Sequence, residues 1–119
     1  MTTITDKLWR TICASTDLVK DSGISALLTT ETGEEEQVAI FYIPNSEDQV
    51  FAVGNYDPIG KANVLYRGLV GCVESEPVVS SPLYKQHYSL KTGQCLQEDD
   101  KKIAVYPIRI EDEQVQVLY

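Results

Sequence analysis

Residues 79–93 run Val79-Ser-Ser-Pro-Leu-Tyr-Lys-Gln-His-Tyr-Ser-Leu-Lys-Thr-Gly93, and an earlier loop runs Asn55-Tyr-Asp-Pro-Ile-Gly60. The later stretch begins with apolar strand residues, turns at a Ser-Pro, alternates toward Tyr88 and Leu90, and reverses at a Thr-Gly. This order of residues predicts a loop carried on a β-hairpin.

Outside these two segments, short runs of β-branched and aromatic residues recur with turn signals roughly every ten residues. They predict strands at 8–13, 24–29, 38–43, 50–53, 103–110 and 115–118, strand-like pieces at 64–67 and 68–73, and a short edge strand at 78–79 beside its prolines. We expect residues 38–43 to be buried on both faces and the acidic run 31–37 to form a solvated hairpin turn. The pattern is typical of an all-β sandwich or small barrel, with 1–119 as one domain.

The charge balance restricts the possible partners. Eighteen acidic residues against ten basic ones give a net charge of -8, which repels nucleic acid and anionic lipid surfaces. The longest apolar run, 38–43, is far shorter than a membrane span, and residues 1–6 do not resemble a signal peptide. We therefore expect a cytoplasmic protein that binds neither nucleic acid nor a membrane.

The residue types that carry chemistry are few. Cys13, Cys72 and Cys95 contain no Cys-x-x-Cys spacing and are predicted to be buried thiols in a reducing compartment. His87 is the single histidine, and neither a Gly-x-Ser-x-Gly elbow nor a phosphate-binding glycine loop is present. The sequence predicts no catalytic centre on this chain.

The two loops resemble the ligand loops of Rieske-type iron–sulfur domains, in which Cys-Pro-x-His-Gly precedes a strand with an aromatic residue and then Thr-Gly. Without gaps, the prolines, the aromatic residue and the Thr-Gly are kept, but all four ligand positions are replaced, at Asp57, Ile59, Ser81 and Tyr84. A Rieske cluster needs two cysteines and two histidines, so it cannot form here in its usual way. We expect no metal or cofactor on this chain.

The resemblance also implies an architecture. Rieske-like domains are antiparallel β-sandwiches with a small inserted subdomain whose two loops meet at one tip. Here the loops would leave a cluster of apolar residues ringed by Asp57, Lys85 and His87, and the cluster comprises Pro58, Ile59, Pro82, Leu83 and Tyr84. Such residues can form either a satellite core of the domain or a docking surface for a partner.

Further segments are similar to one family, the small subunits of cytoplasmic NAD(P)H-dependent nitrite reductase. They are Gln37-Val-Ala-Ile-Phe41, Asp48-Gln-Val-Phe-Ala52, Asn55-x-Asp57-Pro58, Val64-Leu65-x-Arg67-Gly68-Leu69 and Ser81-Pro-Leu83-x-Lys85-Gln86. This resemblance implies a non-catalytic subunit that docks on and supports a large subunit carrying FAD, sirohaem and an iron–sulfur cluster, which reduces nitrite to ammonium. Two alternatives are a cluster-free interaction domain of another oxidoreductase and an electron-transfer protein with atypical ligands.

Overall fold

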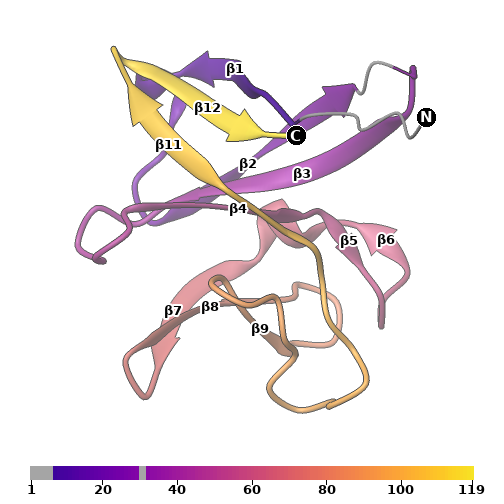
Figure 1. Ribbon diagram of the computed structural model, residues 1–119. Coiled ribbons are helices and arrows are strands. Elements are labelled where there is room, and N and C mark those ends of the chain that lie inside the picture. Colours follow the sequence, from indigo (N-terminus) through magenta and orange to yellow (C-terminus); the bar gives the residue numbers. More distant parts are fainter. Residues whose placement is uncertain (1–6, 30–31) are drawn as a thin grey trace.

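The computed structural model describes residues 7–29 and 32–119, and over these residues the strands form four sheets with antiparallel ladders (Figure 1). Residues 1–6 and 30–31, including the first residue of the predicted acidic turn 31–37, lie outside the described residues. Two sheets form the upper part of Figure 1. One has the order β1-β12-β11 and the other β10-β4-β3-β2. Their bounds are β1 Trp9–Ala14, β2 Ser22–Thr29, β3 Glu35–Tyr42, β4 Val50–Gly54, β10 Val105–Tyr106, β11 Ile108–Glu111 and β12 Gln114–Leu118.

The lower part of Figure 1 is a smaller subdomain inserted between β4 and β10. It contains a two-stranded ladder and a three-stranded sheet of order β7-β8-β9. A 3-10 helix, η2, connects the two, and another, η1 Ser15–Asp17, follows β1. The remaining bounds are β5 Tyr56–Asp57, β6 Ala62–Asn63, η2 Leu65–Arg67, β7 Leu69–Val73, β8 Glu76–Ser80 and β9 His87–Ser89.

The central sheet is buried on both faces, as its apolar sequence predicts. Successive side chains of a strand point to opposite faces, so Val38 and Ile40 enter one core while Ala39 and Phe41 enter the other. The first core lies between the central sheet and the β1-β12-β11 sheet, which we call the upper sheet, and contains Leu28, Val38, Ile40, Ala52, Val115 and Val117. The second packs against the inserted subdomain and contains Ala39, Phe41, Phe51, Val53, Leu65, Val79, Tyr88, Leu90, Cys95 and Ile103. Burying a large apolar side chain such as Phe41 contributes about 1.5–3 kcal/mol, so the second core holds the inserted subdomain against the central sheet.

Several sequence predictions about local structure are wrong for identifiable reasons. Residues 65–67 form a 3-10 turn rather than a strand, because the buried side chain of Asn55 accepts a hydrogen bond from the Tyr66 N–H at 2.8 Å. Strand β8 is the middle strand of its sheet, not an edge strand. Pro77 is tolerated there because the β8–β9 ladder covers only Val78 to Ser80. Pro77 lies outside this ladder, so its missing N–H removes no hydrogen bond between β8 and β9.

Three further boundaries differ from expectation. The predicted strand 103–110 is divided at Pro107, with β10 paired to β4 and β11 paired to β12 in a different sheet. Strand β3 already begins at Glu35, opposite Thr29, so the acidic turn is shorter than predicted. The loop 55–63 contains the short β5–β6 ladder.

All three cysteines are predicted to be buried, and the structure agrees for only part of them. Cys95 is buried and Cys13 is partly buried, but Cys72 is exposed on β7.

Candidate functional site

The two loops singled out in the sequence meet at one end of the inserted subdomain. We call residues 55–67 the first loop, residues 80–87 the second loop, and the two together the tip. Their contact is close at Gly60, where a Cβ atom would collide with Leu83 Cδ1 and lie 2.9 Å from Asp57 Oδ2. A side chain at this position would therefore have to displace Leu83 and press on the Asp57 carboxylate.

A hydrogen-bond network around Asp57 joins the loops. Asp57 is fully buried, and Ser81 Oγ from the second loop donates to its Oδ2. The Tyr88 hydroxyl, from β9, donates to Oδ1 at 2.9 Å, and the Ile59 N–H donates to the same oxygen at 2.9 Å. The Gly60 N–H is a further donor to this carboxylate. The first loop, the second loop and the hairpin strand are thus held by one side chain.

The local sequence explains how the first loop supplies this carboxylate. An aspartate before proline favours a turn in which its side chain accepts the N–H two residues later, here that of Ile59. The backbone then closes with a bond from the Lys61 N–H to the Asp57 carbonyl at 2.6 Å. Asn55, also fully buried, fixes the start of the same loop by donating to the Asn63 carbonyl and to Gln37 Oε1, each at 3.2 Å.

The electrostatics of the network favour a charged carboxylate. Burial alone raises the pKa of Asp57, but the hydrogen bonds from Ser81, the Gly60 and Ile59 N–H groups and Tyr88 outweigh it, so the pKa is lowered. The pKa of Tyr88 is raised by burial and by its bond to this carboxylate, which keeps its hydroxyl as a donor. Asp57 therefore remains ionised, and its charge is met inside the protein.

The second loop is a tight turn built on Ser81. The Ser81 N–H donates to the Gln86 carbonyl at 2.8 Å, and the Lys85 N–H donates to the Ser81 carbonyl at 3.0 Å. Lys85 takes a positive φ of 61° to close this turn. The two residues in the middle of this turn, which we call the apex, consequently face outward: Leu83 is 46% exposed and Tyr84 is 62% exposed.

The structure separates the four replaced ligand positions. Asp57 and Ser81 are buried and hydrogen-bonded to each other, whereas Ile59 is half-buried and packs against the core shared with the central sheet. Tyr84 stands apart at the surface. Among the other predicted docking residues, Pro82 and Lys85 are exposed and Pro58 is half-buried. His87 is half-buried on β9, with Nδ1 3.2 Å from Gln97 Nε2.

These residues do not fit a [2Fe–2S] cluster. The cluster needs thiolate and imidazole ligands, and the four positions offer a carboxylate, an aliphatic side chain, a hydroxyl and a phenol. The two possible oxygen ligands are already occupied by hydrogen bonds. Ser81 Oγ donates to Asp57 Oδ2, and Asp57 Oδ1 accepts from Tyr88 and the Ile59 N–H. Within residues 7–29 and 32–119, no group of three or more His, Cys, Asp or Glu side chains could hold a metal ion.

A serine–histidine pair is not assembled either. Ser81 Oγ is bonded to Asp57, Ser80 Oγ lies 3.4 Å from the Lys85 carbonyl, and the His87 ring contacts Gln97. Nucleophilic catalysis requires the base within hydrogen-bond reach of the nucleophile. These side chains serve the local structure of the turn.

Tyr88 and Asn55 are site residues that the sequence did not identify as such. Tyr88 appeared only as the aromatic residue of a strand, yet its hydroxyl completes the carboxylate network. The available signal was the Asn-x-Asp-Pro motif, since a buried aspartate must find donors beyond its own turn.

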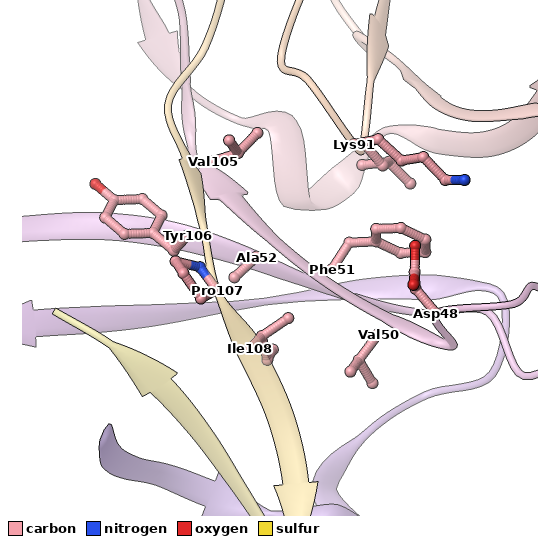
Figure 2. Close-up of a pocket in the computed structure, with 10 residues that line it drawn as sticks. Asp48, Val50, Phe51, Ala52, Lys91, Val105, Tyr106, Pro107 and Ile108 are labelled. Carbon is pink, nitrogen blue, oxygen red and sulfur yellow. The ribbon is translucent and has the colours of Figure 1, made fainter. Parts of the chain in front are cut away.

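A hollow of about 560 Å³ lies away from the tip, between β4 and the β10–β11 segment. Figure 2 shows Asp48 and Lys91 on one side of it near Phe51, with Tyr106 on the other side. The Tyr106 hydroxyl donates to Glu36 at 2.9 Å. The rest of the lining is mainly apolar, and none of the predicted site residues contributes to it.

No helix in the described part of the chain is long and apolar enough to span a membrane.

Known proteins share this fold and much of this sequence. The pattern of the Rieske-like [2Fe-2S] domain family matches residues 8–118. The chain is 39% identical over 109 residues to the nitrite reductase (NADH) small subunit of Escherichia coli strain K12, covering 92% of this chain and 95% of that relative. The NMR structure of the E. coli protein NirD has a TM-score of 0.81 at 38% identity, covering 95% of this chain and 97% of that one. In Klebsiella oxytoca, the nitrite reductase NAD(P)H large subunit matches at 37% identity over 92% of this chain and 11% of its own length.

Proposed function

The chain belongs to the Rieske-like [2Fe-2S] domain family and, within it, to the NADH nitrite reductase small subunits, and from this we propose that it is a non-catalytic subunit of a cytoplasmic NAD(P)H-dependent nitrite reductase. It docks on a large subunit that carries FAD, sirohaem and an iron–sulfur cluster and reduces nitrite to ammonium. The chain itself supplies a shaped surface rather than a redox centre.

The observation that carries this proposal is the construction of the tip. The Asp57 network uses a carboxylate where the family has a cluster ligand, and it holds the two loops without a metal. The loops are thereby ordered before any partner arrives, which reduces the entropy lost on binding. Leu83 and Tyr84 remain exposed at the apex, and exposed aromatic and aliphatic side chains are typical anchors of protein interfaces.

The Klebsiella oxytoca relative supports the identity of the partner. There, a segment similar to 92% of this chain is part of a nitrite reductase large-subunit polypeptide. A covalent linkage raises the effective concentration of one module beside the other, so it replaces a docking equilibrium between separate chains. We infer that the separate chain described here occupies a comparable place on its large subunit.

Affinity purification from the native host grown on nitrite tests the proposal. The tag belongs on the C-terminus, which lies beside the upper sheet and away from β7, β8 and β9 (Figure 1). We expect a large subunit to co-purify, together with nitrite-dependent oxidation of NADH or NADPH in the eluate. Recovery of a different oxidoreductase without this activity would instead identify the chain as an interaction domain of that enzyme.

The contribution of the apex is tested with Tyr84→Ala in the same pull-down. Loss of a central aromatic anchor costs about 2 kcal/mol or more of binding free energy, so we expect recovery of the large subunit to fall sharply. Val19→Ala is the control, because Val19 is an apolar side chain that is 53% exposed between η1 and β2, outside the tip. Equal recovery with Tyr84→Ala and the wild type would exclude the apex as the docking surface.

A further inference from the structure

Charge is distributed unevenly between the tip and the rest of the molecule. The tip holds three of the ten Lys and Arg residues but only one of the eighteen Asp and Glu residues. Lys61, Arg67 and Lys85 are all exposed, whereas the one acid, Asp57, is fully buried. The outer surface of the tip is therefore cationic in a protein whose net charge is -8.

The buried carboxylate does little to cancel these charges at the surface. Asp57 is surrounded by four donors, from Ser81, Tyr88 and two backbone N–H groups, which stabilise its charge internally. Within residues 7–29 and 32–119, no carboxylate forms an ion pair with Lys61, Arg67 or Lys85. Arg67 lies over the Tyr66 ring and donates through Nε to the Tyr66 hydroxyl at 2.8 Å, which leaves its terminal nitrogens for other acceptors.

Two of these cations border one hollow. It has a volume of about 270 Å³ and lies between the end of η2 and the second loop, lined by Arg67, Leu69, Ser80, Ser81, Pro82 and Lys85. Leu69, which lines this hollow together with Arg67, is a large apolar side chain that is 78% exposed. A hollow with two cations, hydroxyl groups and aliphatic walls matches an acidic side chain with its methylene stem.

We propose that the tip binds an acidic segment of the nitrite reductase large subunit, with one carboxylate held between Arg67 and Lys85 and an apolar surface covering Leu69, Leu83 and Tyr84. This inference rests on the proposed function and specifies the chemistry of its docking site. The remaining negative surface of the chain repels the same acidic segment. The charge asymmetry therefore orients the chain so that the tip approaches first.

The test measures binding of the intact chain to the purified, cofactor-loaded large subunit at about 50 mM and about 500 mM salt. Exposed interfacial charges act mainly on the association rate and are screened by salt, so wild-type affinity should fall roughly tenfold across this range. The double variant Arg67→Glu/Lys85→Glu should lose at least about tenfold at low salt and recover part of this loss at high salt, because its two glutamates repel the acidic segment and salt screens that repulsion. Lys7→Glu, an exposed charge next to β1, should behave as the wild type.

The possible results separate this inference from the proposal on which it rests. Tight wild-type binding that does not depend on salt, or a double variant that binds as the wild type does, would overturn the acidic segment and leave docking intact. Failure of the wild type to bind at either salt concentration would overturn both. Circular dichroism melting of each variant distinguishes lost binding from lost folding, and Arg67→Gln/Lys85→Gln should show an intermediate loss if charge is the cause.

Discussion

Asp57 carries more of the tip's structure than any other single side chain. It accepts hydrogen bonds from both loops and from β9 while it is fully buried. The sequence identified Asp57 and Ser81 as replaced ligand positions, but the bond between them depends on how two distant loops approach, which no local pattern contains. Ile59 and Tyr84 are the other two replaced ligand positions, and the structure places Ile59 half-buried against the core and Tyr84 at the surface.

Asp57→Asn should destabilise the domain by about 2–4 kcal/mol at neutral pH, because the amide removes the charge and faces donors with its own NH₂ group. Since the pKa of Asp57 is lowered by folding, its contribution is complete above the unfolded value of about 3.9 and is lost as pH falls through the lower folded value. The free energies of unfolding of the two proteins should therefore converge in acid. Urea denaturation between about pH 7 and about pH 3 measures this.

The matched control for this substitution is Glu36→Gln. Glu36 is an exposed carboxylate that also accepts a tyrosine hydroxyl, that of Tyr106 at 2.9 Å. It should change stability by no more than about 0.5 kcal/mol. A gap between the wild type and Asp57→Asn that stays constant across the pH range would contradict the role given to the buried charge.

At the scale of elements, the sequence predicts what depends on neighbouring residues and misses what depends on distant ones. Strands β2, β3, β4 and β12 follow apolar periodicity and turn residues, and Thr92-Gly93 does mark a reversal, with a φ of 81° at Gly93. The 3-10 turn at 65–67 was missed because the Asn55 side chain, eleven residues earlier along the chain, accepts the Tyr66 N–H. The central place of β8 and the division at Pro107 depend on which strands become partners, and this is decided by packing of the whole sheet.

Gly60→Ala tests whether close contact of the two loops shapes the tip. The added Cβ would displace Leu83 Cδ1 and press on Asp57 Oδ2, so we expect a loss of about 1–3 kcal/mol in stability and a shifted Leu83 methyl resonance. Gly71→Ala on β7 is the control, because a Cβ there meets nothing within 4 Å. Chemical denaturation and methyl NMR of both variants decide the point, and equal effects would mean that the loops do not depend on this contact.

At the scale of the whole molecule, the doubly buried central sheet joins two unequal parts. One core fixes the upper sheet, and the other fixes the inserted subdomain and hence the tip. Net charge was readable from the sequence, but the cationic outer surface of the tip was not, because it depends on Asp57 being inside while Lys61, Arg67 and Lys85 are outside. The molecule thus presents one cationic and partly apolar tip on an otherwise mostly acidic domain.

The central claim is that this chain supports nitrite reduction by docking and takes no part in the chemistry. Titrating the large subunit with wild-type chain and with Tyr84→Ala, while following nitrite-dependent oxidation of NADH, tests it most directly. We expect both proteins to reach the same maximal rate, with Tyr84→Ala needing roughly tenfold or more protein to reach half of it. A variant that saturates at the wild-type concentration, or one whose maximal rate is lost although it binds normally, would contradict the account.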